Sequence, residues 1–210
     1  ARILRDTVPA FGIRDMKLSV ASLPVSVSAR IRLPENKCEI KGSLDIDGCR
    51  INDLTDDFVK GIIPEAENLS TDAAIYLHAD VDGDYDFEKG TLPSFDARME
   101  IHESEFRWKG MDEVVKLAMK AAVATGNSGQ INASFDNLYA RTEGLKLQLA
   151  GGASDLLGED PSITLDGMLD ADLDSLSRFV PDSMNIDLKG RINAGIKGNA
   201  RLSQLSIYNF

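Results

Sequence analysis

The sequence predicts a mainly β fold, namely a curved, elongated antiparallel sheet in the form of a half-pipe or groove. In this fold, strand–helix–strand units repeat, and short helices pack on the apolar concave face. Three observations predict it. Apolar and polar residues alternate along many short segments, three segments carry helix signals between them, and one short motif occurs twice.

Alternation with a period of two is typical of strands that bury one face. Val25, Val27 and Ala29, for example, alternate with Ser26 and Ser28. Parallel strands would instead read as continuous apolar runs, so the sheet is expected to be antiparallel and wet on one face. The alternating segments are residues 25–33, 38–46, 73–81, 95–101, 106–108, 131–135, 145–149, 163–171 and 186–196.

Helices are predicted over residues 53–63, 111–125 and 173–180. Pro64, Gly126 and Pro181 supply their stop signals. Each helix is too short to be stable alone, so each is expected to dock an apolar stripe on the sheet. The residues predicted to cover the groove in this way are Leu54, Phe58, Ile62, Val114, Leu117, Ala121, Leu176 and Phe179.

An internal repeat is visible in the motif GSLDID at residues 42–47, which matches GMLDAD at residues 167–172. A leucine, a Phe-Val pair and a proline follow each copy. The repeat units are approximately residues 37–83, 94–136 and 161–202. We therefore expect residues 1–210 to be a single β-rich fragment of a larger repeat protein, since both ends resemble cut ends.

The apolar strand faces outnumber the helices that could cover them. A sheet folded on itself as a packed core would solve this problem, and so would an open trough that holds a ligand. Residue patterns alone leave both open. The candidate groove residues are Ile40, Leu44, Ile75, Leu77, Met99, Ile101, Phe135, Leu147, Leu149, Ile163, Leu165, Leu169, Ile186, Leu188, Ile192 and Ile196.

The formal net charge of −11 repels phosphate backbones, so nucleic acid is not expected as a partner. No Lys/Arg cluster predicts adhesion to anionic lipid headgroups. No segment has the roughly 20 apolar residues of a spanning helix, and the opening residues 1–5 are too short and too polar for a leader. A membrane anchor is therefore expected outside this sequence.

No catalytic signature is present, so an enzyme is not expected. His78 lies on the polar side of its strand and has no neighbouring nucleophile in the sequence. Cys38 falls on the apolar side of its strand, which predicts a buried thiol, while a Cys38–Cys49 disulfide stays open. No cofactor is expected other than bound lipid.

The carboxylates Asp80, Asp82, Asp84 and Asp86 are the one candidate Ca²⁺ site. In an EF-hand loop counted from Asp80, the glycine would be sixth, but Gly83 is fourth. The twelfth position holds a threonine in place of the bidentate glutamate. We therefore prefer a solvated acidic turn to a metal site.

Residues 129–202 resemble the AsmA family. The resemblance rests on Gly167, Leu169, Ala171-Asp172-Leu173, Leu176 and the run Phe179-Val180-Pro181, followed by a new alternating strand. Residues 42–82 echo the same pattern. AsmA-like proteins, with the similar TamB and chorein-type proteins, form long β-grooves with apolar interiors, which are tethered to the inner membrane of Gram-negative bacteria.

The resemblance implies a non-enzymatic periplasmic groove segment. Such a segment accommodates the acyl chains of phospholipids for transport and for outer-membrane assembly or maintenance, with envelope proteins as further partners. The alternative is a closed β-repeat module, structural or adhesive, that binds another protein.

Overall fold

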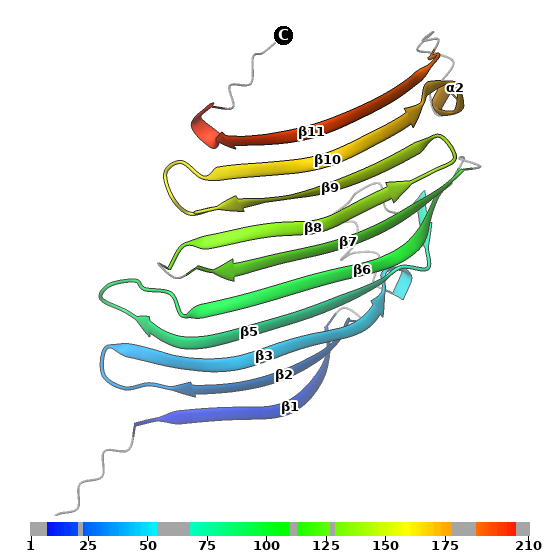
Figure 1. Cartoon of the computed structure of the whole chain (residues 1–210). Helices are drawn as coiled ribbons and strands as arrows, with labels where there is room; N and C mark the ends of the chain where they lie inside the picture. Colours follow the sequence, from blue (N-terminus) through cyan, green and yellow to red (C-terminus); the bar gives the residue numbers. More distant parts are fainter. Residues whose placement is uncertain are drawn as a thin grey trace, which may run out of the picture.

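The computed structural model describes residues 8–20, 23–53, 68–109, 113–126, 129–177 and 188–204. They form one large antiparallel sheet and a few short helical turns (Figure 1). The strands are β1 (Ala10–Val20), β2 (Leu23–Arg32), β3 (Lys37–Arg50), β4 (Leu69–Thr71), β5 (Ala74–Asp86), β6 (Ser94–Trp108), β7 (Val114–Thr125), β8 (Ile131–Arg141), β9 (Leu145–Ser154), β10 (Ser162–Asp172) and β11 (Arg191–Arg201). The turns of helix are η1 (Ile51–Asp53), α2 (Leu173–Leu176) and η5 (Leu202–Gln204).

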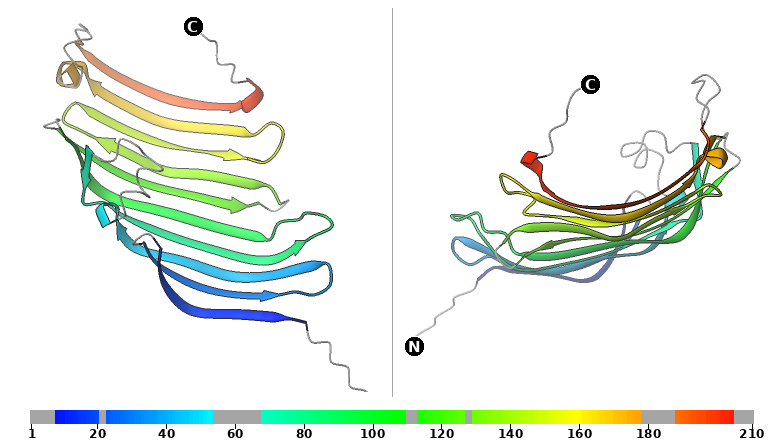
Figure 2. Two further views of the ribbon diagram at one scale, coloured as in Figure 1. Left: turned by 180° about the vertical axis from the view of Figure 1, so that it is seen from behind. Right: turned by 45° about the horizontal axis from the view of Figure 1, so that its top comes forward.

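The sheet has 11 strands in the order β1-β2-β3-β5-β6-β7-β8-β9-β10-β11, with β4 paired to β6 outside this path. Apart from the short strand β4, each strand therefore pairs with the strands that come before and after it in the sequence. Figure 2 shows that the sheet is open and curved along its strands. The prediction of a mainly β, antiparallel fold is confirmed.

Residues 114–125 form strand β7, so the helix predicted over residues 111–125 is wrong. β7 pairs with β6 through Met99↔Ala121 and with β8 through Ala121↔Phe135. Val115, Leu117, Met119, Ala121 and Val123 alternate along it. The apolar residues of this segment also fit the spacing of a helix. Pairing with strands on both sides, however, satisfies the backbone hydrogen bonds of β7, so the segment is a strand. The middle unit therefore lacks its helix.

The predicted helix at residues 173–180 begins where expected, as α2. The Asp172 carboxylate accepts hydrogen bonds from the backbone N–H groups of Asp174 and Ser175, which caps its first turn. The predicted helix at residues 53–63 lies outside the described residues from residue 54 onward. The predicted strand from residue 186 begins later, at Arg191, because Gly190 adopts a φ of 100° and its N–H donates to Asp174 Oδ2.

The alternation pattern does not predict strand β1, because a bulge between Ile13 and Met16 interrupts its alternation. The apolar residues Phe11 and Ile13 have odd numbers, whereas the apolar residues Met16, Leu18 and Val20 have even numbers. The extra residue in the bulge restores all of them to one face. Allowing one inserted residue in the period-two pattern would have revealed this strand.

The buried core lies at one end of the sheet, which we call the helical rim because η1 and α2 lie there (Figure 1). Among the described residues, the buried apolar side chains are Val25, Cys49, Ala73, Phe106 and Ala171. All five lie within the first or last few positions of their strands at this rim, or directly before such a strand. The rest of the sheet is a single layer.

Candidate functional site

The candidate site is the apolar face of the sheet, on which the cross-strand register aligns apolar side chains into lateral rows. One row crosses eight strands and consists of Ile46, Leu77, Met99, Ala121, Phe135, Gly151, Leu165 and Gly198. Neighbouring strands pair with Cβ atoms about 5 Å apart, so the rows form one continuous apolar surface. β1 extends it with Phe11, Ile13, Met16 and Leu18.

Most candidate groove residues lie on this face. They are Ile40 and Leu44 on β3, Ile75 and Leu77 on β5, Met99 and Ile101 on β6, Phe135 on β8, Leu147 and Leu149 on β9, Ile163, Leu165 and Leu169 on β10, and Ile192 and Ile196 on β11. Leu188 precedes β11 and so lies off the sheet, and Ile186 lies outside the described residues.

The residues predicted to cover the groove do not form a layer above it in the described structure. Leu117 and Ala121 lie on the apolar face as part of β7, and Val114 pairs with Arg107 at the start of that strand. Leu176 lies in α2 at the helical rim. Leu54, Phe58, Ile62 and Phe179 fall outside the described residues.

The described residues leave the apolar face largely uncovered. Phe11, Ile192 and Ile196 are 65%, 41% and 40% exposed, and most other side chains of the face are half-buried. The accessible surface is 15019 Å², whereas a compact monomer of the same mass exposes roughly 9,600 Å². An apolar surface of this extent is typical of a ligand or partner site.

The two thiols are free and lie on β3, at opposite parts of the strand. With a rise of about 3.3 Å per residue, their separation in sequence places them on the order of 35 Å apart, so they cannot form a disulfide with each other. Cys38 is half-buried on the apolar face. Burial raises the pKa of the Cys49 thiol, and the nearby Asp53 charge adds to this effect.

The opposite face of the sheet is polar and carries ion pairs between neighbouring strands. Asp84 Oδ2 lies 2.7 Å from Lys37 Nζ, and Asp82 Oδ2 lies 2.6 Å from Lys41 Nζ. Further pairs join Glu100 to Lys120, Asp170 to Arg191 and Asp166 to Lys197. These charged pairs make this face polar and hydrated, whereas the other face is apolar.

The four candidate Ca²⁺ carboxylates do not converge. They alternate along β5, so successive carboxylates are about 6.7 Å apart along the strand, whereas Ca²⁺ requires oxygens at 2.3–2.6 Å from the ion. Asp80, Asp82 and Asp84 contact His78, Lys41 and Lys37. Backbone N–H groups of Lys89 and Glu88 lower the pKa of Asp86. The described residues contain no cluster of three or more metal-ligating side chains.

His78 bridges two strands on the polar face. Its Nδ1 lies 2.5 Å from Asp45 Oδ1 on β3, and its Nε2 lies 2.8 Å from Asp80 Oδ2. Both ring nitrogens donate only in the protonated ring. Hydrogen bonds to Asp45 and then Asp80 therefore raise the pKa of His78 above its usual 6.5.

This geometry predicts a pH-dependent stability. Because the pKa is higher in the folded state, the stabilisation is complete below pH 6.5 and is lost as the pH rises through the raised value. In urea unfolding, wild-type protein should exceed His78→Gln in stability at about pH 5.5 and lose most of that advantage by about pH 8.5. High salt should shrink the difference at the lower pH. A difference that does not change with pH would contradict the bridge.

No helix among the described residues has the length and apolar character needed to span a membrane. Comparisons of the chain with protein-family models, with curated proteins and with solved structures found no significant match.

Proposed function

We propose that the chain is a non-enzymatic groove segment that accommodates the acyl chains of lipids on its apolar face. The observation that carries the proposal is the continuity of this face, which runs across the strands from β1 to β11 and which the described part of the chain leaves uncovered over most of its length. Such binding needs neither reactive groups nor a single essential residue, because it is driven by the burial of apolar surface of the acyl chain and of the sheet.

The energetics favour an acyl occupant. Each CH₂ group transferred from water contributes about 0.8 kcal/mol, so an acyl chain of roughly fifteen methylenes gains on the order of 10 kcal/mol before ordering costs. Strands of 10 to 15 residues are on the order of 33–50 Å long, which exceeds the length of such a chain. The curvature of the sheet along its strands (Figure 2) supports a half-pipe, and the proposal takes the apolar face as its floor.

The open edges favour this proposal over a closed β-repeat module that binds another protein. β1 and β11 are each paired on one side only, so the sheet is not folded into a barrel or sandwich within the described residues. The wider role belongs to the same proposal and is supported by the AsmA resemblance of residues 129–202. That role is phospholipid transport and outer-membrane maintenance in a periplasm, with a tether to the inner membrane.

The direct test is to purify the folded chain from a Gram-negative host, extract it with organic solvent and identify lipids by mass spectrometry. We expect phospholipid in near-stoichiometric amount, and a delipidated sample should recover it from vesicles. Absence of lipid from both samples would reject the proposal. Recovery of a bound protein partner in place of lipid would support the alternative module.

A further inference from the structure

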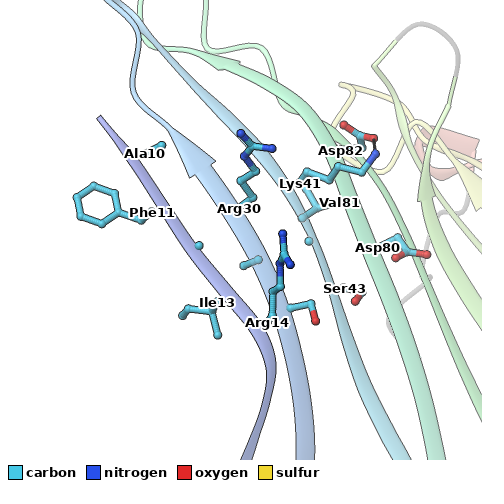
Figure 3. A pocket seen from close by; sticks show the side chains of 14 residues that line it. Ala10, Phe11, Ile13, Arg14, Arg30, Lys41, Ser43, Asp80, Val81 and Asp82 are labelled. Carbon is cyan, nitrogen blue, oxygen red and sulfur yellow. Dashed lines mark hydrogen bonds and ion pairs between the residues drawn. The ribbon is translucent and has the colours of Figure 1, made fainter. Parts of the chain in front are cut away.

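The polar face is hollowed beside the edge strand β1. An open hollow of about 960 Å³ is lined by residues of β1, β2, β3 and β5 (Figure 3). It lies on the face opposite the proposed acyl surface, so binding at the hollow does not depend on lipid binding at that surface.

Three cationic side chains stand at this hollow, from three adjacent strands: Arg14, Arg30 and Lys41. In Figure 3 they share one side of the sheet, and Phe11 and Ile13 point away from them. The register places Arg30 directly opposite Lys41. Like charges in directly opposed positions destabilise a sheet, so this arrangement costs stability unless an anion compensates for it.

The acidic groups near the hollow already have partners. Lys41 Nζ lies 2.6 Å from Asp82 Oδ2, and Asp80 binds His78. Within the part of the chain that the structure describes, no carboxylate lies within ion-pair distance of Arg14 or Arg30. In a chain of net charge −11, two neighbouring arginines without a carboxylate partner are available for an external anion.

Strand β1 has its bulge at Arg14 and Asp15, beside the hollow. Asp15 adopts a φ of 49°, which is a costly conformation for a residue other than glycine. Its N–H donates to Ser28 Oγ at 3.1 Å, and that hydroxyl lies 3.3 Å from Asp15 Oδ1. Bulges re-aim side chains and are enriched near functional sites. Arg14 directly follows Ile13, whose side chain lies on the apolar face, so alternation alone places Arg14 on the polar face beside Arg30.

Small residues leave space between the arginines. Gly12 lies directly opposite Arg30, and a Cβ atom at Gly12 would meet nothing closer than a backbone oxygen at 3.9 Å. Ser28 and Ser43 line the hollow next to it and carry hydroxyl groups. The hollow is therefore open between the two guanidinium groups. The Ser43 hydroxyl lies beside it, while the Ser28 hydroxyl is bonded to Asp15.

We propose that this hollow binds a phosphate group, held by Arg14 and Arg30. The planar guanidinium fork matches phosphate oxygens in two parallel hydrogen bonds, and such charge-assisted bonds are the strong ones in proteins. The phosphate can belong to a soluble phosphate ester or to a lipid headgroup that reaches around the edge of β1. If the arginines only protect the open edge from strand addition, no phosphate binds.

The test uses the whole chain and follows the side-chain Nε–Hε signals of its arginines by NMR. Inorganic phosphate is titrated in one arm. In the other arm, phosphatidylcholine vesicles with and without phosphatidylglycerol are tested by co-sedimentation. The double variant Arg14→Gln/Arg30→Gln should bind about tenfold or more weakly than wild type. The matched control Arg191→Gln removes an exposed cation from the polar side of the other edge strand, and its binding should change by less than about twofold.

Saturable shifts at Arg14 and Arg30 with inorganic phosphate would support a site for soluble phosphate esters. Arginine-dependent sedimentation with phosphatidylglycerol vesicles only would support a lipid headgroup. No arginine-dependent binding in either arm, or an equal loss in Arg191→Gln, would overturn the proposal. The charge variant Leu147→Asp on the other face should keep phosphate binding, which separates this result from failure of the acyl-binding proposal.

Discussion

Replacement of Leu147 by aspartate is expected to reduce the lipid bound per chain by about tenfold or more. Leu147 lies in the interior of the apolar face, in a row with Ala140 and Leu169. A carboxylate covered by acyl chains without a partner costs several kcal/mol, and each 1.4 kcal/mol is a tenfold change in occupancy. The measurement is the quantity of phospholipid extracted per mole of folded protein.

Gln148→Asp is the matched control, since it places the same group one residue further along β9 on the exposed polar face. We expect this variant to retain lipid. Ile192→Asp and Asn193→Asp form a second pair on the edge strand β11, where the partial exposure of Ile192 keeps the effect on folding small. If both members of a pair lose lipid equally, or if neither does, the apolar face is not the acyl site.

Replacement of Gly167 by valine is expected to lower the free energy of unfolding by about 1–3 kcal/mol. An ideal Cβ atom at Gly167 would lie 2.6 Å from the backbone oxygen of Gln148 and 2.4 Å from Leu149 Cδ2. The backbone contact cannot be relieved by a side-chain rotation, so β9 and β10 would have to separate. Urea unfolding followed by circular dichroism measures the loss.

Gly195→Val is the control for that substitution. Gly195 lies on the neighbouring strand β11, and nothing lies within 4 Å of a Cβ atom at this position. Because valine favours strands, we expect no loss of stability there. Equal destabilisation by both variants would show that close strand approach is not the role of Gly167.

The internal match between residues 42–47 and 167–172 has a counterpart in the packing. Gly42 occupies on β3 the place that Gly167 occupies on β10, and its ideal Cβ atom would lie 2.8 Å from the backbone oxygen of Ser28. Both glycines therefore stand where a neighbouring backbone comes close. The motif resemblance includes a position at which only hydrogen fits.

The sequence alone determined that the chain is β-rich, antiparallel and apolar on one side. These properties follow from local alternation, because side chains of a strand point to opposite faces in turn. β3 and β10 were read correctly for this reason, and so was the start of α2, where Asp172 supplies an N-cap. The aspartates of β5 were predicted to form a solvated acidic turn. They lie on the polar side, but within the strand, so the predicted turn is wrong.

Only the tertiary structure decided the features that depend on pairing between distant residues. Residues 114–125 satisfy helical and strand periods alike, and hydrogen bonds to β6 and β8 select the strand. The bulge interrupts the alternation of β1, and the pairing with β2 shows which of its residues share a face. Arg14 and Arg30 are far apart in sequence, so only the register brings them together. The open apolar face likewise depends on how the strands pair into one sheet and on which segments pack against it. A local sequence pattern encodes neither.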